Sequence, residues 1–137
     1  MSWDAAHVIA CLRDFVSGQP TPAVNTNWEA AGCEVWDASA TVYGSEVLVE
    51  QGAGGMLSAL AAAALDRPLD QRSARAGEIA VGVLANIASH TQLQQHLLDQ
   101  GGLAPLVADR VLWADDAAVV TEGCRLSTSL LLSRQVG

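Results

Sequence analysis

A row of side chains spaced four residues apart is the part of this sequence best suited to binding chemistry. Glu78, Gly82, Asn86 and His90 follow one another at this spacing, which places them on one stripe of a helix. The amide of Asn86 can donate and accept hydrogen bonds at the same time. The stripe is therefore suited to reversible binding of a polar partner.

A similar stripe occurs 49 residues earlier, where it reads Glu29, Cys33 and Asp37. At this shift Asp37 corresponds to Asn86, so both copies carry a polar side chain at the same place. Two interpretations are open for these two residues. They contact a partner, or they hydrogen-bond neighbouring helices to each other.

Residue types that commonly catalyse reactions lack catalytic spacing here. The three cysteines form no CxxC or Cys/His ligand pattern, and the histidines have no catalytic partner nearby in sequence (Cys11, Cys33, Cys124; His7, His90, His96). The glycine clusters at 52–55 and 101–102 lack the Lys-Ser/Thr of a phosphate loop and predict helix corners instead. We expect reduced thiols, no catalytic residues, no metal, no cofactor and no enzymatic activity.

Composition narrows the class of partner. The chain has 137 residues, half of them hydrophobic, and a formal charge of −8 with seven Arg and no Lys. An acidic chain without a basic stripe predicts no nucleic acid binding, and a basic peptide or protein face fits its charge better. Neither a signal peptide nor an apolar stretch long enough for a membrane is expected, so we predict a cytoplasmic or nuclear protein with no membrane partner.

The hydrophobic spacing predicts helices throughout and no strands. Apolar residues recur at helical intervals, and Gly, Pro or small polar residues stand at the boundaries. The expected helices cover about residues 2–17, 28–41, 45–51, 56–65, 74–89, 91–100, 103–112 and 115–134. Asn27, Ser45 and Thr91 are predicted N-caps, and Asp115 or Asp116 is predicted to start the last helix. The fold class is therefore all-α.

A short phrase written twice indicates internal repetition. Leu48-Val-Glu-Gln-Gly52 returns as Leu97-Leu-Asp-Gln-Gly101, and each copy is predicted to end a short helix at a glycine corner. Repeats of this length made of helices are typical of a stacked solenoid. We expect one domain over 1–137, with an N-terminal helix at 1–18 and a linker at 19–27. A partial first repeat at 28–41 and repeats at 45–89 and 91–134 would follow.

Two segments carry a family resemblance. Glu78-Ile-Ala-Val-Gly-Val-Leu-Ala-Asn-Ile-Ala88 resembles the third helix of armadillo repeats, and Leu97 to Val107 resembles their corner between the first two helices. Cys33 to Ser39, Gly77 to Asn86 and Glu122 to Leu126 are similar, in order, to segments of the serum-amyloid-A-like armadillo protein family. The resemblance implies a right-handed armadillo-like solenoid of about two and a half repeats plus the N-terminal helix. That family is longer, so this chain would be a short or truncated member.

The resemblance also assigns expected roles to the stripe. In armadillo repeats the residue matching Asn86 lies on the concave face and can hydrogen-bond the backbone of an extended peptide. Relatives that bind basic targeting peptides carry a Trp one turn earlier, where this chain has Cys33 and Gly82. Binding by that mechanism is therefore not expected. Trp36 is offset from the stripe and is predicted to pack in the core or between repeats.

The last helix leaves two registers open and ends in apolar residues. One register places Leu126 and Leu130 on the inner stripe, and a slip of one residue places Thr121, Arg125 and Ser129 there. Solenoids need a polar face at each end. Leu130, Leu131 and Leu132 are instead apolar, so we expect this end to be a contact surface.

The expected function is that of a non-catalytic scaffold or adaptor. Its partner would be a protein or an extended peptide bound by the stripe or by the C-terminal end, and a basic partner fits the net charge. The alternative is a structural subunit buried in a large assembly, or a homo-oligomer.

Overall fold

The computed structural model describes residues 4–17, 27–66, 71–99 and 103–136, and every element within them is helical. The predicted all-α class is confirmed. The elements are α1 (Ala5–Ser17), α2 (Trp28–Ser39), α3 (Val42–Glu50), α4 (Ala53–Leu65), α5 (Gln71–Ser89), α6 (Thr91–Leu98), α7 (Leu103–Leu106), η1 (Val107–Val111) and α8 (Ala117–Val136). Apart from Asn27, the predicted linker lies outside the described residues.

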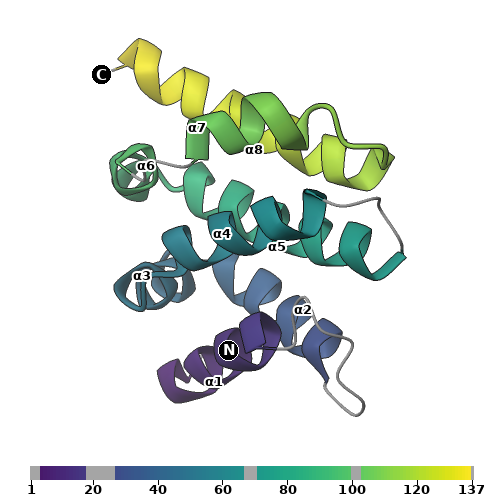
Figure 1. The fold of residues 1–137 in the computed structure, drawn as a ribbon. Coiled ribbons are helices and arrows are strands. Elements are labelled where there is room, and N and C mark those ends of the chain that lie inside the picture. Colours follow the sequence, from purple (N-terminus) through teal and green to yellow (C-terminus); the bar gives the residue numbers. More distant parts are fainter. Residues whose placement is uncertain (1–3, 18–26, 67–70, 100–102, 137) are drawn as a thin grey trace.

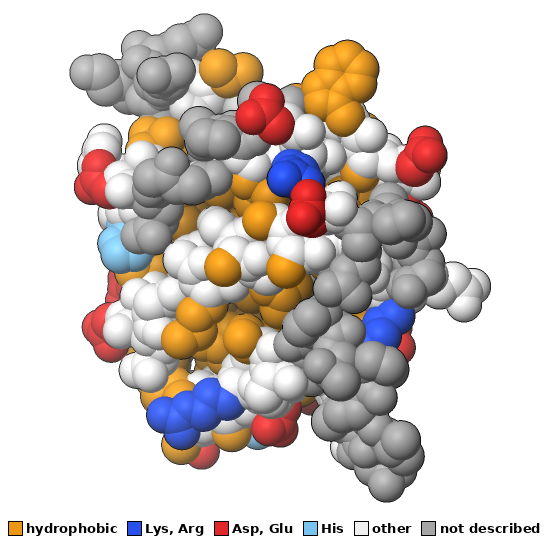
Figure 2. All heavy atoms as spheres, in the orientation of Figure 1, with side chains coloured by type: hydrophobic (Ala, Val, Ile, Leu, Met, Phe, Trp, Pro, Cys, Tyr) orange, Lys and Arg blue, Asp and Glu red, His pale blue; other side chains and the backbone are white. Residues whose placement is uncertain are grey.

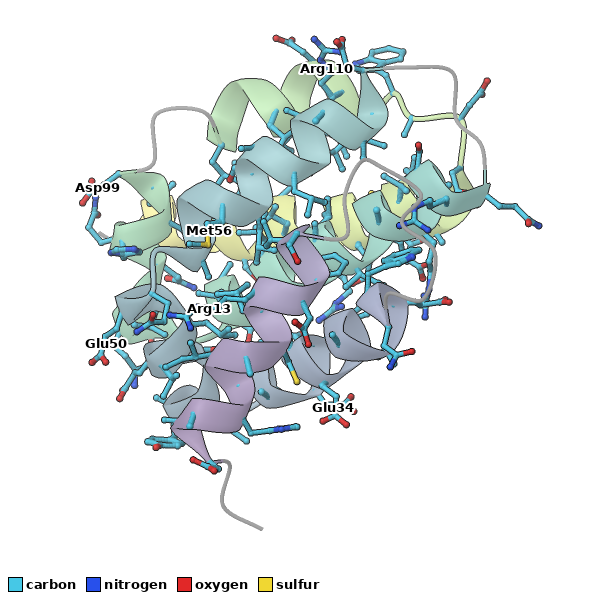
Figure 3. The ribbon with its side chains drawn as sticks, turned by 60° about the horizontal axis from the view of Figure 1, so that its bottom comes forward. Arg13, Glu34, Glu50, Met56, Asp99 and Arg110 are labelled. Atoms are coloured by element: carbon cyan, nitrogen blue, oxygen red, sulfur yellow. The ribbon has the colours of Figure 1, made fainter. Side chains whose placement is uncertain are left out.

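The helices lie in successive layers, with α5 in the middle (Figure 1). α5 packs against α2 on one side, α8 on the other and α4 across its length, while α1 covers α2. Most residues of α5 are buried, including Ile79, Val83, Leu84 and Ile87 at 0% exposure. Side chains fill the space between the ribbons, while the labelled charged side chains of Glu34, Glu50 and Asp99 point outward (Figure 3). The helices α2, α5 and α8 therefore lie next to one another, with α5 between the other two.

The first helix has the predicted apolar face. Val8, Leu12 and Phe15 are buried, and the ring of Phe15 stacks on Trp28 with centroids 6.3 Å apart. Arg72 covers the same indole, with its guanidinium carbon 4.6 Å from the centroid. These contacts join α1 to the start of α2 and to α5. They position α2 for the polar contacts described below.

The predicted cap of the third helix is wrong. α3 begins at Val42, and its N-cap is Thr41, whose Oγ1 accepts a hydrogen bond from the Gly44 amide at 3.0 Å. Ser45 lies inside the helix, where its hydroxyl donates to the Ser39 carbonyl at 2.8 Å. A Cβ at residue 44 would overlap the Ala38 carbonyl, so the close approach of α2 requires glycine there. Thr41 therefore does not belong to α2, which ends at Ser39 and not at residue 41 as predicted.

Other boundaries differ by a few residues. Asn27 precedes α2 without a side-chain capping bond, and His90, not Thr91, occupies the N-cap of α6. Asp116 caps α8 as predicted, since its Oδ1 accepts from the Ala118 and Val119 amides, each at 3.1 Å. The helix expected at 103–112 is α7 followed by the wider turn η1, in which the Leu112 amide donates to the Val107 carbonyl.

The corner between α3 and α4 is made by Gly52. Its φ of 78° lies in the left-handed region, and α4 begins at the next residue. The axes of α3 and α4 differ by 80°. The predicted glycine corner is therefore present in the first copy of the repeated phrase, while residues 100–102 of the second copy lie outside the described residues.

Among the described helices, none alone has the length and apolar content to cross a bilayer. The pair α3 and α4 meets that test only when the two are taken together across their 80° bend.

Substitution of Gly52 tests the corner. A Cβ at positive φ costs about 1–2 kcal/mol, so we expect Gly52→Ala to lower the free energy of unfolding by about that amount. No atom lies within 4 Å of the position of a Cβ at residue 52, so the effect isolates backbone strain. Gly52→Asn should cost less, because Asn tolerates this region better. Urea denaturation followed by circular dichroism compares the three proteins, and equal stability of all three would contradict this account.

Candidate binding surface

The polar stripe comprises Glu78, Gly82 and Asn86 on α5, His90 directly after it, and Glu29, Cys33 and Asp37 on α2. The structure brings these two helices side by side, and five of the seven positions form contacts across the boundary between the two segments, while Glu78 bonds to Arg75 on its own helix. Much of the polar stripe therefore holds helices together. Only groups of the polar stripe that are not used in such contacts remain available to a partner.

Arg75 neutralises the acidic end of the polar stripe. Its Nε donates to Glu29 Oε2 at 2.8 Å, its Nη1 to Glu78 Oε1 at 2.9 Å and its Nη2 to Cys33 Sγ at 3.3 Å. Burial alone would lower the pKa of Arg75, but the bonds to Glu78 and Glu29 outweigh it and raise the pKa. Glu29 and Glu78 are therefore already paired. Arg75 did not emerge from sequence, although its position three residues before Glu78 is an i, i+3 pairing signal.

At Gly82 the indole of Trp36 on α2 packs directly against the backbone of α5. A Cβ at residue 82 would overlap the indole of Trp36, with Cζ2, Cε2 and Nε1 as the nearest atoms. The prediction that Trp36 packs between helices is thus confirmed. Its ring occupies the space beside Gly82, which a side chain would otherwise fill.

Asn86 is bonded on both sides of α5. Its Nδ2 donates to the Trp36 carbonyl at 3.1 Å and to Ser39 Oγ at 3.0 Å, and its Oδ1 accepts from Arg125 Nη2 at 2.6 Å. The amide group links α2, α5 and α8. Both of its N–H groups are used, and one lone pair on Oδ1 remains.

His90 and Asp37 are the last residues of the two rows of the polar stripe, and only His90 is bonded to the neighbouring helix. His90 Nε2 lies 3.0 Å from the Ser39 carbonyl, which identifies Nε2 as the protonated donor. Asp37 is exposed, and its carboxylate makes no side-chain hydrogen bond to any residue that the structure describes. Asp37 is thus the stripe carboxylate left available to a partner.

The register of α8 follows from its contacts. Leu126 is fully buried and Leu130 packs against the core, whereas Arg125 reaches Asn86 on α5. The register with Thr121, Arg125 and Ser129 is therefore the one that continues the polar surface. Arg125 also pairs with Glu122, one turn earlier on the same helix.

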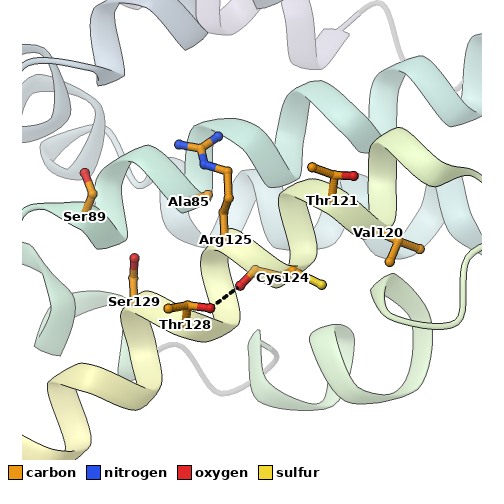
Figure 4. Close-up of a pocket in the computed structure, with 8 residues that line it drawn as sticks. All are labelled: Ala85, Ser89, Val120, Thr121, Cys124, Arg125, Thr128 and Ser129. Atoms are coloured by element: carbon orange, nitrogen blue, oxygen red, sulfur yellow. Dashed lines mark hydrogen bonds between the residues drawn. The ribbon is translucent and has the colours of Figure 1, made fainter.

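An open groove of about 580 Å³ runs between α5 and α8 beside Asn86 (Figure 4). Its lining residues are small or polar: Ala85, Ser89, Val120, Thr121, Cys124, Arg125, Thr128 and Ser129. In Figure 4 the Arg125 side chain extends from α8 toward α5, next to Ala85. The groove continues the surface of the polar stripe toward α8.

Exposed apolar side chains lie toward both ends of α8, and not only at the C-terminal end that the sequence indicated. Leu131 is 58% exposed, Leu130 is partly buried against the core, and the side chain of Leu132 lies outside the described residues. Trp113, in the turn before α8, is 81% exposed, and its neighbour Leu112 is partly exposed. Sequence reasoning missed Trp113, since nothing in the local pattern distinguishes it from a core tryptophan.

A second, smaller hollow of about 290 Å³ lies between α1, α4 and the start of α5. It is mainly apolar, with Val16, Met56, Leu60 and Ala64 among its lining residues. Figure 2 shows small apolar side chains over α4 and charged groups toward the margins of this face. This hollow lacks the hydrogen-bonding variety of the groove.

Cys11, His7 and Glu34 form a cluster between α1 and α2. Cys11 Sγ is 3.6 Å and Glu34 Oε2 is 3.5 Å from the same atom, His7 Nε2. A catalytic relay needs the nucleophile and the carboxylate on different ring nitrogens, so this arrangement does not build one. Over the described ranges, no three Cys, His, Asp or Glu side chains gather in a group that could hold a metal ion.

Comparison with known proteins adds no relative. No family model, no curated protein and no solved structure matches this chain. The geometry of the surface is therefore the basis for inferring its function.

The contact between Gly82 and Trp36 can be tested by a double-mutant cycle. In a helix interior Ala is favoured over Gly by about 1 kcal/mol. Overpacking against the indole costs typically 1–3 kcal/mol, so we expect Gly82→Ala to destabilise the protein. In a Trp36→Leu background the same substitution should be neutral or stabilising. Thermal and urea unfolding measure both, and an equal effect in the two backgrounds would exclude the contact.

Thiol reactivity should separate the cysteines. Burial raises the pKa of Cys11, and the nearby charges of Glu34 and Asp14 raise it further. Because the thiolate is the reactive form, Cys11 should be alkylated much more slowly than exposed Cys124 in the folded chain. The pKa of Cys11 in the folded chain lies above its pKa in the unfolded chain. The free energy of unfolding should therefore fall as the pH rises from the unfolded-state pKa towards the folded-state pKa. Iodoacetamide labelling read by mass spectrometry gives the rates, with the urea-unfolded chain as control; equal rates in the folded chain would contradict the assignment.

Proposed function

We propose that this chain is a short, right-handed armadillo-like solenoid with an N-terminal helix and about two and a half repeats. The order of its helices supports this. α3, α4 and α5 are short, intermediate and long, and α6, α7 with η1, and α8 follow in the same order. α2 would be the long helix of the partial first repeat. The helices α2, α5 and α8 then carry the concave face.

In this proposal the chain is a non-catalytic scaffold or adaptor that binds a protein or an extended peptide. The observation that carries it is the open groove between α5 and α8, continuous with the polar stripe. Asp37 adds an exposed carboxylate at the α2 side. A partner can occupy both without first displacing the bonds of Arg75 or those that Asn86 makes to α2.

The charges of the polar stripe limit how it would attract a basic partner. Arg75 holds Glu29 and Glu78, so local attraction at α2 depends on Asp37, and the net charge of −8 acts only at longer range. A basic segment is accordingly proposed for the α2 side alone.

A second candidate function is a subunit of a larger assembly or of a homo-oligomer. The exposure of Trp113 and Leu131 favours it, because large apolar side chains in contact with water are typical of interfaces. In that case the apolar residues next to and on α8 form the contact, and the polar stripe only stabilises the fold.

Selection of short displayed peptides on the full chain tests the adaptor function. We expect bound peptides to shift the amide NMR signals of Asp37, Asn86 and Ser89, because these residues line the proposed surface. Asp37→Asn should weaken the binding of any basic peptide at α2. Glu50→Gln, which removes an exposed carboxylate on α3, is the matched control and should have no effect.

Two results would count against the adaptor function. One is a failure to select any peptide while the protein self-associates through Trp113, as shown by loss of association in Trp113→Ser. The other is a set of peptides whose NMR shifts are confined to Leu112, Trp113 and Leu131.

A further inference from the structure

We propose that the groove between α5 and α8 binds an extended peptide through an acidic side chain, with Arg125 as the residue that recognises the carboxylate. This inference rests on the proposed function and assigns a chemical class to the partner at this end of the surface. It differs from the basic partner expected from the net charge, because the groove has a different local charge from the chain as a whole.

Arg125 is the one charged side chain among the residues that line the groove. Its side chain is 46% exposed, while that of its partner Glu122 is only 12% exposed. The cation therefore faces the groove and the anion lies beneath it. An incoming carboxylate meets the guanidinium before it meets Glu122.

The guanidinium also has donors to spare. An arginine carries five N–H groups in a planar fork. Arg125 directs Nη1 to Glu122 and Nη2 to Asn86, and the described residues accept no others. The remaining N–H groups can bond a carboxylate without breaking the link to Asn86, and such charge-assisted bonds are among the stronger ones in proteins.

The hydroxyl groups of the groove supply acceptors. Ser89 donates to the Asn86 carbonyl at 2.6 Å, Thr121 to the Ala117 carbonyl at 2.8 Å and Thr128 to the Cys124 carbonyl at 2.8 Å. Because each hydroxyl hydrogen is used within its own helix, each oxygen is left as an acceptor. Acceptors of this kind match the backbone N–H groups of a peptide.

The dimensions fit an extended segment. Thr121 and Thr128 lie seven residues apart on α8, which corresponds to roughly 10 Å along a helix. An extended chain covers that length in about three residues. A peptide that runs along α8 can thus place backbone N–H groups near both threonines and a side chain on Arg125 between them. A basic side chain at the same place would face the guanidinium with like charge.

The test uses the full chain and synthetic peptides amidated at the C-terminus, so that side chains carry the only carboxylates. Peptides selected from the displayed library should share one Asp or Glu. Replacing that residue by its amide should weaken binding about tenfold or more, as expected for loss of a charge-assisted hydrogen bond. Fluorescence anisotropy measures the dissociation constants.

The matching protein variant is Arg125→Gln combined with Glu122→Gln, which avoids leaving a nearly buried carboxylate unpaired. The acidic peptide should bind this variant about tenfold more weakly than it binds the wild type. The amide peptide should bind the variant and the wild type with equal affinity. Arg125→Lys should keep part of the affinity. Arg110→Gln with Asp66→Asn removes an ion pair of the same kind outside the groove and is the matched control. Thermal unfolding verifies that each variant is folded.

Cys124 provides an independent footprint, since it lines the groove and is exposed. Bound peptide should slow its alkylation. Neutral or basic peptides that bind with equal affinity to the Arg125 variant would overturn this inference. If such peptides still shift the amide NMR signals of the polar stripe, the adaptor function is supported and only the preference for an acidic side chain is wrong. If no peptide is selected at all, both fail.

Discussion

The close approach of α2 and α5 at Gly82 is the constraint on which the rest of the surface depends. With the Trp36 ring against a residue that has no side chain, α2 lies near enough for short polar side chains to cross between the helices. Asn86 can then reach the Trp36 carbonyl and Ser39, and Arg75 can reach Glu29. A larger residue at position 82 would widen this spacing and break bonds at both ends of α5.

Two arginines control the electrostatics of the surface. Arg75 joins two carboxylates and removes them from any attraction of cations, while Arg125 exposes a positive charge over a nearly buried Glu122. A chain with a net charge of −8 can therefore present a partly exposed guanidinium to a groove that no carboxylate of the described residues lines. Net charge alone is a poor guide to the ligand of a particular groove.

Sequence patterns predicted the parts of the structure that depend on local physics. Hydrophobic spacing located the helices, Asp116 was recognised as a cap, and the offset of Trp36 from the stripe indicated packing. The prediction of Ser45 as the cap of α3 was wrong, because the cap at Thr41 depends on how closely Gly44 approaches the Ala38 carbonyl. The bonds of Arg75 to Glu29 and of Arg125 to Asn86 were not predicted, because these partners lie on other helices at sequence separations that no helical period encodes.

Asn86 shares one amide group between two interfaces, the one with α2 and the one with α8. Hydrogen bonds in such a chain polarise one another, so the donor strength of Nδ2 depends on what Oδ1 accepts. A ligand that draws Arg125 toward itself weakens one bond of the amide and alters the other without touching α2. The bonds that Asn86 makes to α2 and to α8 thus belong to one planar group, so the two interfaces of α5 are not chemically independent.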